Sequence, residues 1–179
     1  MTRAPTPDEI AARAAHVLFS KKLLTNVHRA VVVEAIVSAA LGDDWTWCSE
    51  DYASCDFRHK DGTRLEVKQS ASLQSWNAET LMPSVCQFDI AERSGEWKGS
   101  VWTEGKSRNA DIYLLCHHPF ISADADHRDA LQWRFFAISE RELPKQGTIR
   151  LSVLERTHAP ASYDMLRDTV EKLRAGLNP

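Results

Sequence analysis

Apolar residues recur along this chain with two different spacings, which predict helices at both ends and strands between them. The first helix signal is Thr6-Pro7-Asp8-Glu9, an N-cap followed by a first-turn proline and a capping-box glutamate, and it predicts a helix to about Lys22. A second helix is expected to begin at Thr25-Asn26 and to end at Gly42. This helix is apolar on most sides, which predicts that it is largely buried. A last helix is expected over 161–175.

Short strands are predicted between these helices. The clearest pair spans 52–59 and 63–70, because the joining Lys60-Asp61-Gly62 contains the Asp-Gly pair that favours a hairpin turn. Further strands are expected at 45–48, 87–91, 110–117, 133–138 and 148–154, with a helical turn at 139–143 and a loop or loosely paired hairpin at 94–109. This order predicts one α/β domain over 1–179, with a mixed sheet of four to six strands flanked by helices.

Composition narrows the class of protein. The 179 residues fit one domain, and an apolar fraction of 43% is enough for a hydrophobic core. No apolar run approaches the ~20 residues of a membrane span, and the first residues do not resemble a signal peptide, so a cytoplasmic protein without membrane contact is expected. In that compartment Cys48, Cys55, Cys86 and Cys116 are expected to be buried thiols. The net charge of −3 does not indicate nucleic-acid binding, although a local basic groove would suffice for it.

The residues that suggest chemistry lie in the predicted hairpin. Glu66 and Lys68 are two positions apart on a strand, so their side chains leave the same face, while Leu65 and Val67 leave the other face and can pack into a core. Asp56 precedes the turn on the partner strand, and the hairpin brings it level with Glu66. Two carboxylates can then bind one hard cation such as Mg²⁺, which acidifies a bound water and neutralises charge on a phosphate. The ammonium of Lys68 can orient that water.

The E-x-K spacing alone leaves other interpretations open. It occurs again in Glu96-Trp97-Lys98 and Glu104-Gly105-Lys106, where glycines and serines replace the apolar strand context. Asp89 precedes the first of these and makes it a rival site. Glu66 and Lys68 also fit a solvated strand face that carries a weak cross-charge pair.

The same stretch resembles the PD-(D/E)xK nuclease superfamily, which includes restriction endonucleases and many DNA repair nucleases. The matching residues are Asp56 on one strand and Glu66-Val67-Lys68 on the next. The run from Glu66 to Trp76 is similar to a bacterial branch in which the motif continues into serines and glutamines and ends in tryptophan. Glu34 matches a helix glutamate that aids metal or water positioning in many such families. One departure is Cys55, which stands where the motif has proline.

The resemblance implies a restriction-endonuclease-like core and Mg²⁺-dependent hydrolysis of phosphodiester bonds, with DNA rather than RNA as substrate and Mn²⁺ able to substitute. It assigns Asp56, Glu66 and Glu34 to the metal and Lys68 to the attacking water. Restriction-type cutting of both strands would favour a homodimer. Two alternatives remain: a catalytically silent DNA-binding or assembly module of the same fold, and an α/β protein unrelated to nucleic acid.

Polar and basic residues near aromatic ones are candidates for contact with nucleic acid, through phosphate binding and base stacking. One group follows Lys68, and a second lies in the segment 97–108. The candidates are Gln69, Ser70, Ser72, Gln74, Lys98, Lys106 and Arg108. Ordinary solvated loops would explain both groups equally well. His117 and His118 are adjacent on a predicted strand and face opposite ways, so no joint metal site is expected from them.

Overall fold

A computed structural model gives the structure of the chain and describes residues 3–48, 53–98 and 101–177, without the side chains of 96–98. The described residues form four α-helices: α1 (Pro7–Phe19), α2 (Asn26–Leu41), α3 (Leu151–Thr157) and α4 (Tyr163–Leu177). Three short 3₁₀ helices join them, at Ser75–Asn77, Ala130–Gln132 and Glu140–Glu142. In the described part of the chain, no helix combines the length and the apolar character needed to cross a bilayer.

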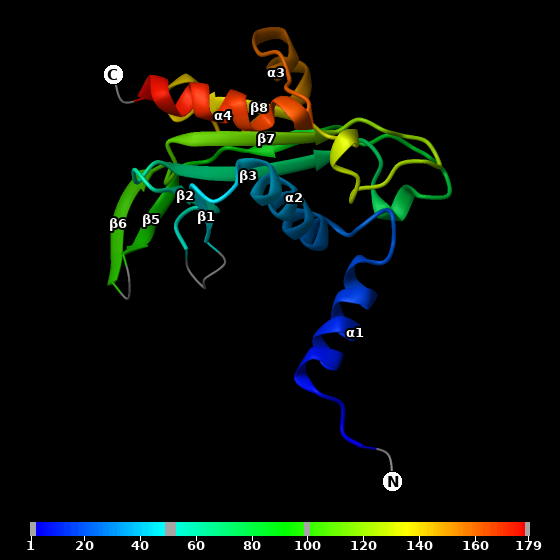
Figure 1. Cartoon of the computed structure of the whole chain (residues 1–179). Helices are drawn as coiled ribbons and strands as arrows, with labels where there is room; N and C mark the ends of the chain where they lie inside the picture. The colour runs from blue at the N-terminus through cyan, green and yellow to red at the C-terminus, as the bar shows by residue number, and fades with distance from the viewer. Residues whose placement is uncertain (1–2, 49–52, 99–100, 178–179) are drawn as a thin grey trace.

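A mixed five-stranded sheet forms the centre of the molecule (Figure 1). Its strands, in spatial order, are β1 (Trp45–Trp47), β2 (Phe57–His59), β3 (Arg64–Ala71), β7 (Ile112–His118) and β8 (Arg134–Ser139). The β3–β7 pair is parallel and the other pairs are antiparallel. The predicted α/β class, with a mixed sheet and flanking helices, is therefore confirmed.

Two small antiparallel pairs stand beside this sheet. In one, β4 (Gln87–Asp89) pairs with β9 (Thr148–Arg150). In the other, β5 (Arg93–Lys98) pairs with β6 (Val101–Ser107), so the segment expected to be a loop or loose hairpin is a paired ribbon. Within it, Gly95 lies against the Trp102 ring, where an added Cβ would be only 2.4 Å from a ring carbon.

Each face of the sheet carries its own apolar core. Side chains alternate between the faces along a strand, so Leu65 and Leu114 pack with Val37 of α2 and Val170 of α4 on one face. On the other face, residues of β7 and β8 pack with β4, β9 and α3; they include Tyr113, Leu115, Phe136, Phe88, Ile149 and Leu154. The α2 face of β3 therefore presents apolar residues such as Leu65 and Val67, and its other face presents the polar residues Glu66 and Lys68.

The start of α1 and the end of α2 follow local rules, whereas the Thr25 side chain makes no capping hydrogen bond at the start of α2. Thr6 caps α1 by accepting the Glu9 N–H, and the Glu9 carboxylate accepts the Thr6 N–H in return. Gly42 ends α2 with a positive φ of 74°. None of the α1 residues is buried, and the helix extends away from the rest of the chain (Figure 1). The predicted first and second helices are both present, but α1 contributes nothing to the core.

The strand expected at 148–154 is wrong beyond its first three residues. β9 ends at Arg150, and α3 begins at Leu151. Within the described residues, β9 pairs with β4 over three residues, and the Leu151 N–H donates a last hydrogen bond to the Cys86 carbonyl at 3.0 Å. The chain then turns into a helix that places Leu154 in the core, fully buried. The strand expected from residue 52 begins at Phe57, and residue 52 lies outside the described residues.

Candidate active site at the free edge of β3

The difference in length between β2 and β3 creates the candidate site. β2 pairs with β3 only through Phe57 with Leu65 and Arg58 with Arg64, so β3 continues past the end of its partner. Asp56 lies just before β2 and takes the place of a further strand residue. Its carboxylate Oδ2 accepts the Val67 N–H at 2.7 Å, and its own N–H donates to the Leu65 carbonyl at 3.1 Å. Asp56 is thereby fixed at the free edge of β3.

Glu66 and Lys68 leave the same face of β3 and contact each other. Lys68 Nζ lies 2.5 Å from Glu66 Oε1, and the two side chains are 23% and 18% exposed. On the opposite face Leu65 and Val67 are buried in the core with α2. The alternation predicted from the sequence is confirmed, and the pair is far less exposed than an ordinary surface ion pair.

Burial, and then the closeness of other carboxylates, determines the electrostatics of the site. Burial raises the pKa of Asp56 to about 7, and the negative charges of Glu66 and Glu34 raise it further. The hydrogen bond from the Val67 N–H and the positive charge of Lys68 act in the opposite direction. Burial also raises the pKa of Glu34, whose Oε2 accepts the Trp47 indole N–H at 2.9 Å. Glu66 raises the pKa of Glu34 further, so the three carboxylates lie within electrostatic range of one another. Such a group gains stability from any added positive charge.

The donor set suits a divalent cation with few protein ligands. Among the described residues, no three His, Cys, Asp or Glu side chains are grouped so that they could hold a metal ion by themselves. The predicted set of Asp56, Glu66 and Glu34 is therefore not assembled as a three-ligand site. Mg²⁺ commonly keeps several waters and uses only one or two carboxylates, together with substrate phosphate oxygens. The crowding of Asp56 with Glu66 fits an ion of that kind.

A groove of about 490 Å³ runs beside the free edge of β3. Residues of α2 line one side of it and residues of β4 and β9 line the other. The lining from α2 and β3 comprises Asn26, Arg29, Ala30, Glu34, Val67, Lys68, Gln69 and Ser70, and the remainder is Asp56, Gln74, Trp76, Gln87, Asp89 and Thr148. Two of the three predicted catalytic strand residues, Asp56 and Lys68, thus open directly onto one groove.

The polar residues that follow Lys68 divide into two groups. Gln69, Ser70 and Gln74 line the groove, as a substrate contact requires. Ser72 does not line it: the Ser72 hydroxyl lies 3.0 Å from His117 Nε2, on the face away from α2. His118 points elsewhere, with its Nε2 3.1 Å from the Gln132 side-chain oxygen, so the two histidines do not act together.

Among the basic residues of the segment 97–108, Lys106 and Arg108 have described side chains, and neither lines this groove. Lys106 is on β6, 80% exposed, and its ammonium lies 3.6 Å from Glu92. Arg108 does not line the groove, and its guanidinium donates to the carbonyls of Ile90, Leu143 and Pro144. Lys98 has its backbone in β5, but its side chain lies outside the described residues.

Arg29 is a residue of the site that the sequence interpretation missed. It lies on α2, lines the groove and is only 1% exposed. Its three hydrogen bonds go to amide oxygens: Nε to Gln69 at 2.5 Å, Nη1 to Gln74 at 2.9 Å and Nη2 to Asn26 at 2.9 Å. The sequence did offer a signal for Arg29, because it lies in an otherwise apolar helix. Burying an arginine there costs free energy unless it has a partner, as it does for Glu34.

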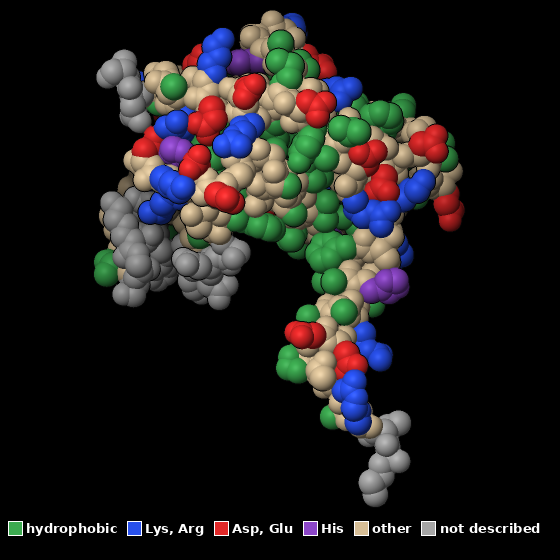
Figure 2. All heavy atoms as spheres, in the orientation of Figure 1, with side chains coloured by type: hydrophobic (Ala, Val, Ile, Leu, Met, Phe, Trp, Pro, Cys, Tyr) green, Lys and Arg blue, Asp and Glu red, His purple; other side chains and the backbone are tan. Residues whose placement is uncertain are grey.

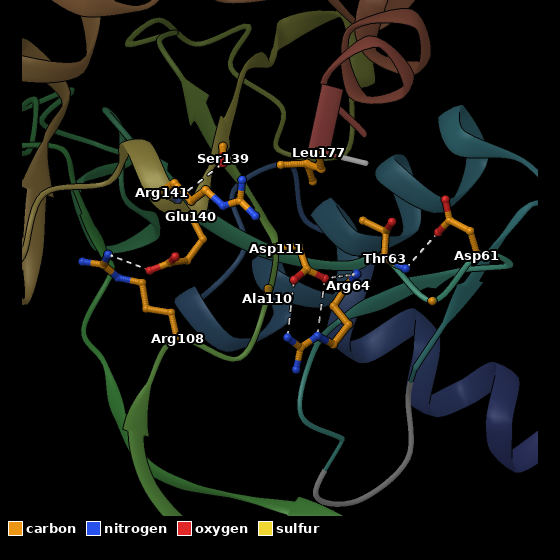
Figure 3. Close-up of a pocket in the computed structure, with 11 residues that line it drawn as sticks. Asp61, Thr63, Arg64, Arg108, Ala110, Asp111, Ser139, Glu140, Arg141 and Leu177 are labelled. Atoms are coloured by element: carbon orange, nitrogen blue, oxygen red, sulfur yellow. Dashed lines mark hydrogen bonds and ion pairs between the residues drawn. The ribbon is translucent and has the colours of Figure 1, made fainter. Parts of the chain in front are cut away.

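A second polar cavity, of about 400 Å³, lies at the opposite end of β3 (Figure 3). Two of its arginines are paired with carboxylates: Arg64 with Asp111 at 3.4 Å, and Arg108 with Glu140 at 3.3 Å. Arg141 and Asp61 also line the cavity, so its charges balance, unlike those at the β3 edge. Acidic and basic side chains also mix across the molecular face in Figure 2, which agrees with the small net charge of −3.

No protein-family model matches the chain, and no curated protein is similar to it. Function is therefore inferred from the residues of the site and their geometry.

Proposed function

We propose that this chain is a metal-dependent nuclease that hydrolyses phosphodiester bonds of DNA, built on a restriction-endonuclease-like core of the PD-(D/E)xK superfamily. One observation carries the proposal: at the free edge of β3, Asp56 and Glu66 repel each other beside the ammonium of Lys68. Asp56 and Lys68 line one groove, and Glu66 contacts Lys68 beside it. Two carboxylates and an amine are the groups that phosphodiester hydrolysis needs. A solvated surface pair would show neither this burial nor this crowding.

Asp56 and Glu66 are the residues that would hold Mg²⁺, or Mn²⁺ in its place, because both offer carboxylate oxygens. When bound, such an ion supplies an acidified water and neutralises charge that develops on the phosphate. Lys68 lines the groove and can hydrogen-bond the attacking water, stabilising its negative charge as a proton leaves. Glu34 is held by the Trp47 indole and supports the water or the metal from the α2 side.

Gln69, Ser70 and Gln74 fit the polar wall against which a nucleic-acid backbone would lie. Trp76 stands at the same groove and is 70% exposed, as a stacking surface for an unpaired base would be. These features support nucleic acid as the substrate, whereas an α/β protein unrelated to nucleic acid would not need them together.

One observation favours the alternative of a silent DNA-binding or assembly module. No three-ligand group is present among the described residues, and Lys68 already neutralises part of the Glu66 charge. A silent module need not bind Mg²⁺ or Mn²⁺, whereas the proposed nuclease must. Calorimetric titration with Mn²⁺ separates the two.

The test is cleavage of supercoiled plasmid and of single-stranded DNA with Mg²⁺ or Mn²⁺. The variants are Asp56→Asn, Glu66→Gln and Lys68→Ala, with Lys172→Ala as a control that removes an exposed lysine from α4. We expect metal-dependent cleavage that falls by at least about 100-fold in each site variant and is unchanged in the control.

Two results would contradict the proposal. Equal cleavage by the wild type and all variants would point to a contaminant or to another site, with Glu96 and Lys98 the next candidates. Absence of cleavage together with absence of Mn²⁺ binding would favour the silent module.

A further inference from the structure

Arg29 is a buried cation without an anionic partner in the described part of the chain. All three of its hydrogen-bond acceptors are neutral amide oxygens, from Asn26, Gln69 and Gln74. By contrast, Arg108, the other deeply buried arginine, has Glu140 beside it. Burial lowers the pKa of Arg29 to about 10, which leaves the guanidinium charged at neutral pH.

A buried charge of this kind is costly unless another charge or strong hydrogen bonds offset it. Here the amides offset part of the cost, and they also fix the guanidinium in one orientation. A guanidinium has five N–H groups, and the described residues accept three of them. Nη1 and Nη2 therefore each keep one N–H that no described residue accepts, and phosphate oxygens are strong acceptors for guanidinium N–H groups.

We propose that Arg29 is the anchor of a phosphate-binding subsite in the groove, with Asn26, Gln69 and Gln74 as the residues that position it. A phosphate of the ligand supplies the negative charge that balances the Arg29 guanidinium. The identification of this phosphate with nucleic acid rests on the proposed nuclease function; the anion site itself does not. Gln69 and Gln74, expected from the sequence to contact phosphate, act on it through Arg29.

The placement of the subsite suits a phosphate next to the one that is cleaved. Arg29 and Lys68 line the same groove, and Gln69, which holds Arg29, directly follows Lys68 on β3. Two sources of phosphate fit this chemistry: an internal phosphodiester of the strand and a terminal phosphomonoester. A pair of oligonucleotides of one sequence, with a 5′-phosphate or a 5′-hydroxyl, distinguishes them.

The first experiment measures binding of fluorescein-labelled single-stranded 12-mers by anisotropy in EDTA, so that cleavage plays no part. Arg29→Gln is expected to weaken binding about tenfold. The slope of log K against log salt is expected to fall by about 0.7, the value for one phosphate contact on a single strand. A loss that is larger for the 5′-phosphorylated strand assigns the subsite to a terminal phosphate, and an equal loss assigns it to an internal one.

A second variant guards against a failure of Arg29→Gln to fold. Gln69→Glu places a carboxylate on Arg29 Nε and supplies the missing anion from within the protein. It also removes the N–H groups that Gln69 donates to the backbone and side-chain oxygens of Asn26, a loss that the new ion pair with Arg29 offsets. We expect this variant to keep or raise the melting temperature and to bind the 12-mers about tenfold less tightly. Gln87→Glu is the matched control, because it adds the same charge to the same groove from an exposed position on β4. Its loss of affinity is expected to be clearly smaller than that of Gln69→Glu.

Inorganic phosphate tests the anion site without nucleic acid. It is expected to raise the melting temperature of the wild type more than that of Gln69→Glu, at equal ionic strength. Equal phosphate stabilisation in both proteins, with an unchanged salt slope in Arg29→Gln, would overturn the subsite. These results do not depend on cleavage. The nuclease proposal can therefore fail while the phosphate subsite is supported, and the subsite can fail while the nuclease proposal is supported.

Discussion

His127 makes the stability of the fold depend on pH. The ring is fully buried, its Nδ1 accepts the Leu24 N–H at 3.0 Å, and its Nε2 lies 3.1 Å from the Leu73 carbonyl. This pair of partners requires the neutral ring with its proton on Nε2. Burial, followed by the charges of Arg29 and His118, lowers the pKa of His127 from 6.5 to about 3. Between about pH 3 and pH 6.5, His127 is therefore protonated in the unfolded chain but neutral in the folded protein.

The sign and the size of the effect follow from this difference. The contribution of His127 is fully present above pH 6.5 and is lost as pH falls toward 3, because only the unfolded chain binds the proton in that range. At pH 4.5 the loss is about 2.5 kcal/mol relative to pH 7, since the unfolded ring is then almost fully protonated and the folded ring is not. The lowered pKa of His117, about 4, acts in the same direction.

Urea unfolding at pH 7 and pH 4.5 measures the effect in the wild type and in His127→Gln. The variant is expected to be less stable at pH 7, but its free energy of unfolding should fall by about 2.5 kcal/mol less between the two pH values. His16→Gln, at an exposed position of α1, is the control and should keep the wild-type dependence. An equal pH dependence in the wild type and His127→Gln would refute the reasoning, because His117 and the carboxylates would then account for all of it.

Three further predictions concern other parts of the molecule. Gly95→Ala should disrupt the β5–β6 ribbon, because the new Cβ would clash with the Trp102 ring; faster amide exchange confined to 93–107 would show this, and unchanged exchange would contradict it. Asp56→Asn should raise the free energy of unfolding in EDTA at pH 8 by about 1–2 kcal/mol, because it removes charge repulsion, and should abolish any stabilisation by Mg²⁺; a less stable variant would argue against crowding. Deletion of residues 1–16 should leave the urea midpoint of the remaining chain unchanged, since none of the α1 residues is buried, and a clear drop in the midpoint would reveal packing that the fold does not contain.

Local chemistry made much of the fold predictable from the sequence. Thr6 with Glu9, Gly42 and the Asp61-Gly62 turn act within a few residues, so the elements they start or end are where the sequence placed them. The failure at 151–154 is of another kind. Apolar residues there suit a strand or a helix equally. As a helix, the segment places Leu154 in a core with Phe88, more than 60 positions earlier in the chain, which no local pattern reveals.

In the candidate site, too, local sequence patterns predicted some residues, and long-range contacts determine the role of others. Glu66 and Lys68 were found because a strand repeats every two residues, which is a local rule. The role of Arg29 depends on Gln69 and Gln74, which lie 40 and 45 positions away, and no local pattern brings them together. Arg108 was misleading for the same reason: its carbonyl partners come from remote loops, and only the fold shows that they bury it.

Charge balance in the groove leads to a last prediction. Asp89 is paired with Arg93 at 2.8 Å. Above pH 7, where Asp56 is ionised, this leaves two positive charges, on Arg29 and Lys68, and three negative ones, on the carboxylates at the β3 edge. A phosphodiester would add a further negative charge, and one divalent cation would then restore neutrality. Strand binding and cation binding should therefore favour each other, and by linkage each should raise the affinity of the other by the same factor.

Anisotropy titration of a single-stranded 12-mer with Ca²⁺ in place of Mg²⁺ tests this coupling at constant ionic strength. Ca²⁺ should tighten binding to the wild type and should have a clearly smaller effect on a double variant, Asp56→Asn with Glu66→Gln, in which the crowded charges are gone. Divalent ions weaken simple electrostatic contacts with nucleic acid by competing for the phosphates. Weaker binding of the wild type in Ca²⁺ would therefore mean that the carboxylates and the phosphate do not share a cation, and the groove would have to be assigned another ligand.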